Sequence, residues 1–411
     1  MNEEADIVVV GGGPCGSFSA LTAAKLGAEV VVCEEHREIG VPTHCSGHVS
    51  VRGLKRLELR LPQEIIENEI EGAVFYSPIG EEFRVRCASP VSLVVNREAL
   101  DKHFSDLAMK AGVQYLLESR VESFVLDSGF VTGVTVRRRG AKETLGSHVV
   151  IDAEGCSSVL LKRAGLQTLD RSMVVNAVHA EVDWVSEVSL DTVEVYLGRK
   201  FAPGFFAWII PKRDSSAKVG LATGRGDPRV YLRRFMRDHP IASKKLSKSK
   251  ITRLSLHPIP LGGPIPKTYS NGLLIVGDAA SQVKPTTGGG IIFGLLCSKM
   301  AGEVAYQAVE NRNYSENFLS RYQSRWKEAV GFDMMVMRQA RKLLTRLTDE
   351  KIDKIIRLCA KLGVDKSLEE VRDLDFQGKL LIRLLRRPAT SILALYFLLS
   401  SLTSPTRSFS P

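Results

Sequence analysis

Apolar positions follow two patterns along this chain, and the first fifty residues show one of them. Ile7–Val10 is a continuous apolar run, which is typical of a strand buried on both faces. Ser17–Leu26 is a stretch of small and apolar residues that stops at Gly27, as a helix does. Glu29–Glu34 predicts a second strand. The order of strand, glycine turn, helix and strand indicates a nucleotide-binding α/β unit.

Further segments extend this unit. A strand ending at Val95 precedes a helix that we expect from Asn96 to about Ala111. Val113–Val121 and Gly129–Arg139 alternate as strands of an accessory sheet, and His148–Asp152 is another buried strand.

The second pattern is the alternation of apolar and polar residues, with a period of two, that is typical of half-buried strands. Gly72–Cys87 and Met173–Thr223 follow it and predict a second sheet. Asp214–Ser249 holds many Lys, Arg and Ser residues and predicts a helix with a solvated face, and the pattern from Tyr314 onward is helical.

Together these elements predict an α/β fold with a Rossmann-like nucleotide domain, an inserted β-rich substrate domain and a helical C-terminus. We assign residues 1–71, 88–172 and 265–312 to the nucleotide domain. Residues 72–87 and 173–264 form the substrate domain, and 313–411 form the C-terminal helical region.

Composition narrows the class of protein. Hydrophobic residues make up 44% and charged residues 25%, which excludes bulk disorder and a multi-span membrane protein. The seven cysteines form no CxxC pair, so neither a disulfide framework nor a metal site is expected. The first six residues are acidic where a signal peptide would be basic, and we expect a cytoplasmic protein.

The basic balance is concentrated near the C-terminus. Of the net charge of +10, +6 lies in residues 331–411, which hold fifteen basic and nine acidic side chains. No nucleic-acid-binding signature accompanies this charge, and the aromatic residues are not interleaved as a stacking platform requires. A nucleic-acid partner is therefore not expected.

The glycine turn carries the first chemical signal. Gly11, Gly13 and Gly16 are spaced as GxGxxG, where the first allows a tight turn and the second lets a pyrophosphate approach the backbone. The third permits close packing of helix and strand. Glu34 follows where an acceptor for ribose hydroxyls belongs.

A second cofactor signature begins at Gly272, where a strand delivers Asp278 to accept from a sugar-like hydroxyl chain. A glycine turn then opens a helix that reaches about Val309, and its positive end can face a ring system that carries negative charge. This turn comprises Pro285, Gly288, Gly289, Gly290 and Ile291.

Two further segments qualify as cofactor contacts. The loop Pro42–Ser50 is either an ordinary polar loop or lies beside the cofactor with Cys45 facing the reacting centre. His44 and His48 lack a third ligand, which makes a metal site improbable. Arg97, at the start of its helix, can fork onto a phosphate or cap a neighbouring loop.

These motifs resemble the geranylgeranyl reductase family, a branch of the flavoproteins with the p-hydroxybenzoate hydroxylase fold, and its archaeal digeranylgeranylglycerophospholipid reductases in particular. The resemblance runs from about Asp6 to the helix after Gly290, with weaker similarity on to residue 390. It also includes Phe206–Lys212, FAWIIPK, which is similar to the family's Tyr-x-Trp-x-Phe-Pro-Lys.

The resemblance implies FAD as the cofactor. Carried over by position, the residues implied to contact FAD beside the glycines of the two turns are Cys15, Glu34, Cys45, Ser46, Gly47, Arg97, Val121, Asp278, Gly290 and Ile291. The residues implied to contact substrate are Phe206, Trp208, Pro211 and Lys212.

Three positions depart from the family pattern. Glu154 stands where the wider fold has aspartate, and Phe206 and Ile210 replace Tyr and Phe. The last two changes remove a hydroxyl and an aromatic face at the substrate end.

The implied activity is FAD-dependent reduction of C=C bonds in geranylgeranyl chains of archaeal-type lipid precursors. Reduced FAD would give hydride to one alkene carbon, and Cys45 is the first candidate for the proton donor. The electron donor is open between ferredoxin, a deazaflavin and a nicotinamide. The alternatives are a flavin-dependent monooxygenase or halogenase, whose Trp-x-Trp-x-Ile-Pro is only partly matched, and a non-catalytic prenyl-lipid carrier.

The C-terminal region suggests contact with a membrane surface. Ser391–Leu402 lies in an uncharged stretch, Ala389–Ser404, that is shorter than the ~20 residues of a spanning helix. Upstream, Lys379–Arg387 mixes leucine with arginine as interfacial helices do. We expect a peripheral position at the inner face of the cell membrane, against the alternative of a helix that covers the core.

Overall fold

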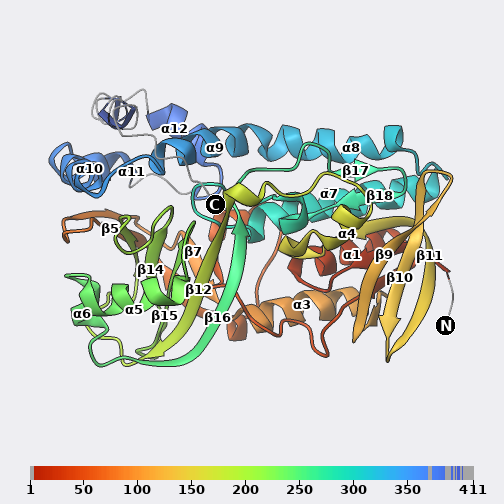
Figure 1. Cartoon of the computed structure of the whole chain (residues 1–411), viewed down its shortest axis with the longest axis horizontal. Helices are drawn as coiled ribbons and strands as arrows, with labels where there is room; N and C mark the ends of the chain where they lie inside the picture. The colour runs from red at the N-terminus through yellow and green to blue at the C-terminus, as the bar shows by residue number, and fades with distance from the viewer. Residues whose placement is uncertain are drawn as a thin grey trace. The chain divides into compact units, whose positions relative to one another are not determined.

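Two units of structure divide the chain in the computed structural model (Figure 1), which describes residues 4–368, 373–384, 390, 391, 394, 396–398 and 400. The first unit comprises Met1–Thr43, Arg97–Arg171 and Pro260–Met334. The second comprises His44–Asn96, Ser172–Ile259 and the chain from Met335 onward. These boundaries differ from those expected, because all of His44–Asn96 groups with the second unit.

The sheet of the first unit has a parallel core. Strands β18, β11, β1, β2 and β8 lie in that order, and β9 and β10 extend β11 as an antiparallel ribbon. The strands are β1 (Glu4–Val10), β2 (Val30–Cys33), β8 (Gln114–Leu116), β9 (Ser119–Asp127), β10 (Phe130–Arg138), β11 (Ala141–Asp152), β17 (Tyr269–Ser270) and β18 (Leu273–Ile275). The expected strand Val113–Val121 is in fact two strands, because the chain turns at Glu118, where φ is 51°.

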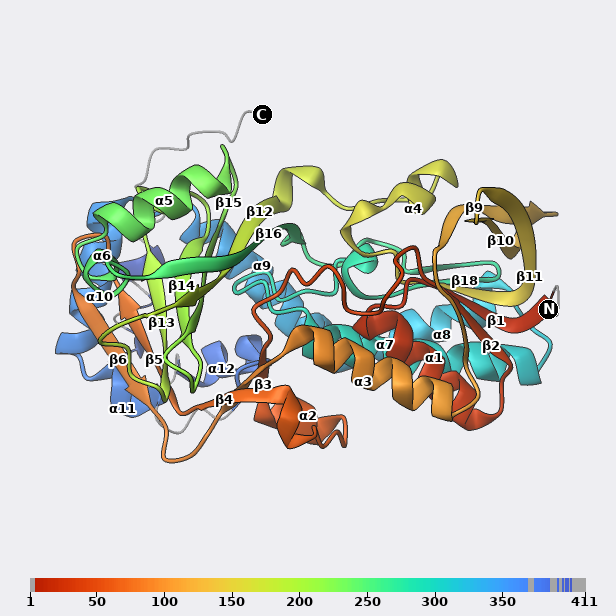
Figure 2. The same cartoon turned by 90° about the horizontal axis from the view of Figure 1, so that it is seen from below.

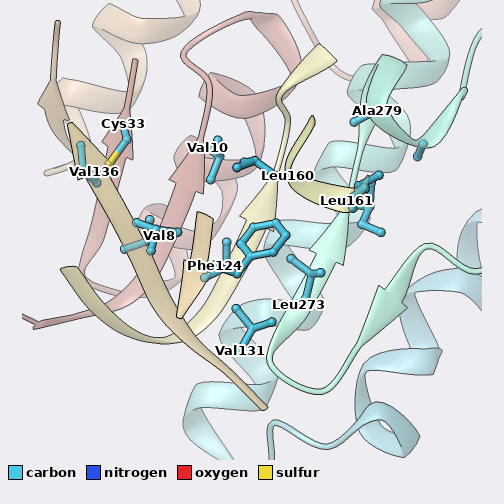
Figure 3. Close-up of a cluster of buried hydrophobic side chains, with 14 of the residues drawn as sticks. Val8, Val10, Cys33, Phe124, Val131, Val136, Leu160, Leu161, Leu273 and Ala279 are labelled. Atoms are coloured by element: carbon cyan, nitrogen blue, oxygen red, sulfur yellow. The ribbon is translucent and has the colours of Figure 1, made fainter. Parts of the chain in front are cut away.

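Buried apolar side chains hold this sheet together. Figure 3 shows one cluster, in which Val8 and Val10 from β1 gather with Phe124 from β9 and with Leu160 and Leu161. Both faces of the parallel strands are covered, which explains their unbroken apolar runs.

Helices cover the first unit's sheet, and α1 contacts both α3 and α7 (Figure 2). Its helices are α1 (Pro14–Leu26), α3 (Arg97–Lys110), α4 (Val159–Arg163), α7 (Ile291–Glu310) and α8 (Glu316–Trp326), with η2 (Gly155–Ser157), η4 (Gly277–Ala280) and the π-helical turn η5 (Lys327–Gly331). Gly302 lets α7 approach α1 closely, because an added Cβ there would lie 2.5 Å from the Ser19 carbonyl oxygen.

The second unit is built on a seven-stranded sheet of order β16, β12, β15, β14, β13, β5, β6, in which β13 and β5 are parallel. Its strands are β5 (Gly72–Tyr76), β6 (Glu82–Arg86), β12 (Val174–Asp183), β13 (Thr192–Leu197), β14 (Phe206–Pro211), β15 (Ala217–Thr223) and β16 (Lys250–Pro260). A smaller sheet has the order β3 (His48–Ser50), β7 (Ser92–Val95), β4 (Ile66–Ile70).

One face of the larger sheet packs against α5 and α6 (Figure 2). Val178, Val219 and Ile209 from three neighbouring strands meet Leu232 and Phe235 of α5 there. Because side chains alternate along a strand, His179, Lys218, Gly220 and Trp208 belong to the opposite face. We call this opposite face the substrate face, because the resemblance implies that its Trp208 contacts substrate.

The helices of the second unit are α2 (Val51–Arg56), α5 (Pro228–Asp238), α6 (Ala242–Lys245), α9 (Phe332–Leu344), α10 (Asp349–Lys361), α11 (Val364–Leu368) and α12 (Gln377–Leu384), with η1 (Gln63–Ile65) and η3 (Arg171–Met173); α9 and η3 begin in the first unit. The segment Asp214–Ser249, expected as one helix, holds β15 before α5 and α6. Among the described residues, none of the helices has the length and apolar character needed to cross a bilayer.

Candidate nucleotide site and substrate face

The glycine turn after β1 is shaped by close backbone contacts. A Cβ at Gly16 would lie 1.9 Å from the Gly11 carbonyl oxygen, and one at Gly11, where φ is 93°, would lie 2.6 Å from the Ala153 carbonyl oxygen. At Gly13 an added Cβ would meet no protein atom within 4 Å. The turn is therefore closed toward the protein at two glycines and open at the third.

Helix α1 begins in this open space. Its N-cap is Gly13, no side chain caps it, and its first turn holds no acidic residue. The backbone N–H groups of such a terminus, with the positive end of the helix dipole, attract a phosphate.

Glu34 closes the side of the turn. Its Oε2 accepts from the Gly12 N–H at 2.7 Å, and its Oε1 accepts from the His36 N–H at 2.9 Å. The side chain is 11% exposed, so backbone groups hold the carboxylate in one position. That position is the one at which the sequence predicts a ribose acceptor.

Asp278 belongs to η4 and lies beside the N-terminus of α7. The Cys156 thiol donates to its Oδ2 at 3.4 Å, and a Cβ at Gly290, the N-cap of α7, would lie 3.3 Å from its Oδ1. No side chain caps α7 either. The loop before it turns back on itself, because the Gly288 N–H donates to the Lys284 carbonyl at 2.9 Å.

The Cys15 thiol points into the protein. Cβ atoms added at Gly277 and Gly294 would lie 2.8 and 2.5 Å from its Sγ. Burial, followed by the charge of Asp278, raises the pKa of the Cys15 thiol to about 12. Any contact of Cys15 with a cofactor is therefore left to its backbone.

The Arg97 side chain pairs with a residue of its own helix, α3. Its guanidinium forks onto both carboxylate oxygens of Asp101 at 2.9 Å, and both side chains are nearly buried. Burial raises the pKa of Asp101 while Arg97 opposes that rise. Val121 lies on β9, partly buried against the core of the first unit.

These features fit FAD. Two helices with glycine N-caps and no side-chain caps belong to one unit, and the space at Gly13 is open for a pyrophosphate. Glu34 and Asp278 place carboxylate oxygens beside these two helix starts, and such oxygens suit the hydroxyl groups of a dinucleotide.

A series of hydrogen bonds to backbone groups holds the Cys45 loop in the second unit. The Gly47 N–H donates to the Cys45 Sγ at 3.4 Å, and the Gly47 carbonyl accepts from the Val95 N–H at 2.8 Å. The Val95 carbonyl in turn accepts from the Lys218 Nζ at 2.8 Å. A buried lysine of the sheet thus anchors the strand that holds the cysteine loop, and Ser46 lies within that loop.

Lys218 is one end of a charged chain on the substrate face. It lies 2.5 Å from Glu67, which also pairs with Lys212 at 3.4 Å. Lys212 pairs with Glu181 at 3.4 Å, and Glu181 with His179 at 3.5 Å. Burial opposes ionisation of Glu181, yet His179, Lys218 and Lys212 together lower its pKa to about 2.

Of these charged and polar residues on the substrate face, the sequence analysis predicted a functional role for Lys212 alone. A signal for Lys218 was available, because it is a lysine inside the apolar strand β15 and is only 2% exposed. Glu67, Glu181 and His179 left no such signal, since polar residues on half-exposed strands are common.

Aromatic side chains continue the substrate face. The indole of Trp208 lies against Gly220, where an added Cβ would be 2.5 Å from its Cζ2 atom. Phe206 meets Trp208 edge to face at 6.1 Å and stacks on Phe205 at 4.2 Å. Pro211 is the last residue of β14, and its carbonyl accepts from the Asn68 side chain at 2.9 Å.

Family models match most of the chain. The model of the FAD dependent oxidoreductases matches residues 6–169, and that of the geranylgeranyl reductase catalytic domain matches residues 173–254.

Curated relatives extend the match. The chain is 34% identical to digeranylgeranylglycerophospholipid reductase 2 of Methanopyrus kandleri over 85% of this chain and 89% of that protein. It is 36% identical to digeranylgeranylglycerophospholipid reductase 2 of Methanothermobacter thermautotrophicus, with coverages of 86% and 91%.

Solved structures agree on the fold. A geranylgeranyl bacteriochlorophyll reductase-like protein from Thermoplasma acidophilum superposes with a TM-score of 0.84 at 27% identity, covering 96% of this chain and 99% of that one. A flavin-dependent brominase superposes with a TM-score of 0.71 at 17% identity over 95% and 98% of the two chains, which shows a shared fold alone.

Proposed function

The chain belongs to the family of digeranylgeranylglycerophospholipid reductases, and on this premise we propose that it reduces the isolated C=C bonds of geranylgeranyl chains in archaeal-type lipid precursors. The observation that carries the proposal is the pairing, in one chain, of an open FAD site with the geranylgeranyl reductase catalytic domain. An FAD-dependent oxidoreductase acting on CH–CH groups accounts for both.

The first unit's residues bind and orient the cofactor. FAD, once reduced by the electron donor, supplies a hydride equivalent. The N-terminus of α1 would hold the pyrophosphate, Glu34 the ribose, and Asp278 the hydroxyl chain next to α7. Gly290 keeps the start of α7 free of side-chain atoms, so its N–H groups can face the ring.

Cys45 supplies the proton. In the reaction one alkene carbon receives hydride and the other receives the thiol proton, and the thiolate is reprotonated from water. The Gly47 N–H donates to Sγ, which orients the sulfur while leaving its S–H free to donate elsewhere. An isolated alkene is a poor hydride acceptor, so orientation and exclusion of water carry much of the rate.

One experiment separates this function from its rivals. Enzyme reduced with dithionite without oxygen, and given a lipid with two geranylgeranyl chains, should yield products heavier by whole hydrogen pairs in a mass spectrum. A monooxygenase or halogenase, which shares the fold, would instead require oxygen and add oxygen or halogen. A carrier would bind the lipid and leave it unchanged.

Variants of Cys45 test the proton donor. We expect Cys45→Ala to slow reduction by about 10²-fold or more, the usual contribution of a general acid, while FAD binding persists. Cys45→Ser should keep part of the rate through its hydroxyl. Full turnover in Cys45→Ala would remove Cys45 from the mechanism but leave the function standing.

The same proposal places the enzyme at the inner face of the cell membrane, where its lipid substrate resides. Support comes from the basic C-terminal region and from exposed apolar side chains there, namely Leu381, Ile382 and Leu398. Ferredoxin, a deazaflavin and a nicotinamide are the donor classes to be tested as reductants of the bound cofactor.

A further inference from the structure

Arg341 is a buried cation without a matching anion. It lies on α9 and is only 6% exposed. Its Nη2 donates to the Gly204 carbonyl at 3.0 Å, whereas its Nε is buried without a hydrogen-bond partner. Within the part of the chain that the structure describes, no carboxylate forms an ion pair with it.

The other buried cations of the second unit are paired. Lys218 has Glu67, and Lys245 has Glu194. A charge removed from water costs several kcal/mol unless an opposite charge compensates it, which explains these pairs. Burial lowers the pKa of Arg341 to about 10, so the guanidinium stays charged at neutral pH and bears that cost.

The surroundings of Arg341 point to a ligand with an apolar part. Its guanidinium lies over the ring of Phe205 at 5.5 Å. Phe205 stacks on Phe206, and Phe206 meets Trp208 on the substrate face. One aromatic surface therefore leads from the buried charge to the sheet, and a molecule with an anionic head and an apolar chain matches both ends.

We propose that Arg341 binds the phosphate of the lipid substrate's head group, with the aromatic surface of Phe205, Phe206 and Trp208 contacting the chain next to it. The inference rests on the proposed function and adds the head-group chemistry to it. Arginine suits this task because its planar guanidinium can donate two parallel hydrogen bonds to a phosphate. The phosphate supplies the counter-charge that the described residues do not.

The test compares two lipids that differ only in the phosphate: a glycerophosphate with two geranylgeranyl chains, and the same lipid with a free hydroxyl. In full-length holoenzyme, Arg341→Met should raise the KM of the phosphorylated lipid by at least about 20-fold, the loss expected for a charged hydrogen-bonded pair. The KM of the unphosphorylated lipid should stay within about twofold. Arg341→Lys, which keeps the charge but loses the fork, should fall between.

Arg338→Met is the matched control, because Arg338 is exposed and lies one turn away on the same helix. It should change neither KM. Equal losses on both lipids in Arg341→Met and Arg341→Lys would mean that Arg341 only supports the Gly204 turn, and no loss would mean that the phosphate binds elsewhere. Either result overturns the proposal.

Binding is measured separately, so that the site and the reaction can fail independently. Calorimetric titration of the oxidised wild-type holoenzyme should show the phosphorylated lipid binding at least about 20-fold more tightly than its alcohol. Equal affinities would refute the phosphate site, even if Arg341→Met does not fold. If the wild type shows the difference but reduces neither lipid, the site stands and the proposed function is wrong.

Discussion

The candidate binding sites of the two units are formed by different parts of the chain. In the first unit, glycines leave space for a ligand or close it off, and the N-termini of α1 and α7 carry no side-chain cap, so backbone N–H groups are available there beside the carboxylates of Glu34 and Asp278. In the second unit, the candidate groups are side chains: Lys218 and Arg341 lie buried among apolar strands and helices, and Glu67 is partly buried. A site formed by backbone groups should lose its ligand when a side chain is added to one of its glycines. A site formed by side chains should lose its ligand when one of those side chains is shortened. The four predictions that follow test this contrast.

The largest effect is expected at the glycine turn. Gly13→Val should abolish FAD binding without unfolding the protein, because its side chain enters space that no protein atom fills. Gly16→Ala should destabilise the protein by about 3 kcal/mol or more, because its Cβ would collide with the Gly11 carbonyl. Flavin absorbance and thermal melting measure the two outcomes. If Gly13→Val keeps full absorbance, the cofactor is misplaced, and if it unfolds, the open space is misjudged.

Acid should unfold the second unit before the first. Burial lowers the pKa of His239 to about 4, so the unfolded chain takes up the proton first. The stabilisation is complete above pH 6.5 and is lost as pH falls toward 4, at a cost of about 3 kcal/mol. In the first unit, burial raises the pKa values of Asp101 and Asp152, so acidification favours the folded state.

Hydrogen exchange followed by mass spectrometry locates this loss. Between pH 7 and pH 4.5, protection should fall in β12–β15 while β1 and β11 keep theirs. A His239→Gln variant, which cannot become charged, should lose less protection over this range. Simultaneous loss in both units would contradict the contrast.

Loss of one charged side chain should weaken the substrate face. Lys218→Met leaves Glu67 without its 2.5 Å partner and the Val95 carbonyl without its donor. We expect the free energy of unfolding to fall by about 3 kcal/mol, and the double variant with Glu67→Gln to recover part of it. Urea denaturation measures the stability of each variant.

The Cys45 loop provides the second measurement. If Lys218 anchors this loop through Val95, iodoacetamide should alkylate Cys45 at a different rate in Lys218→Met, as read by peptide mass spectrometry. Lys218→Arg, which keeps a charge and a donor, is the control. An unchanged alkylation rate would show that the lysine supports the sheet and leaves the loop unaffected.

The smallest effect is expected at the C-terminus. Deleting the residues after Pro388 removes the apolar run Ser391–Leu402, half of which lies outside the described residues. Upstream, Ser50 donates to Asp375 and Arg56 lies 4.0 Å over the ring of Phe376, so the cut leaves that anchored segment in place. Co-sedimentation with anionic vesicles should fall by an amount worth about 1 kcal/mol, with flavin absorbance unchanged.

The opposite outcome has a structural basis as well. Ser400 is buried, and its carbonyl accepts from Lys351 of α10 at 2.8 Å, so one side of the run touches protein. If the truncated protein loses FAD or unfolds, the run is part of the core and the proposed membrane contact fails.

The sequence predicted the nucleotide unit well because its rules are local. Gly27 ends α1 in a left-handed conformation with φ of 115°, and α7 spans Ile291–Glu310 where a helix to about Val309 was expected. These features depend on neighbours in the chain. The grouping of His44–Asn96 with the second unit depends instead on pairing β5 with β13, which are more than one hundred residues apart.

The same distinction explains the site residues. The positions of Glu34 and Asp278 follow from motifs, and in the structure Glu34 lies against Gly12 while Asp278 lies beside Gly290, the N-cap of α7. The inward direction of the Cys15 thiol and the lone charge of Arg341 do not, because each depends on what a distant segment brings nearby.

The three-segment assembly of the first unit also sets an order of events during synthesis. Strand β1 leaves the ribosome early but pairs with β11, and α1 packs on α7, which is made almost three hundred residues later. Translation at about 5–20 residues per second leaves these partners apart for many seconds. Meanwhile β12–β15 can pair as soon as they emerge, since they are neighbours in the chain. The nascent chain should therefore pair β12–β15 before it completes its nucleotide unit, and truncated chains should expose β1 and β2 to chaperones.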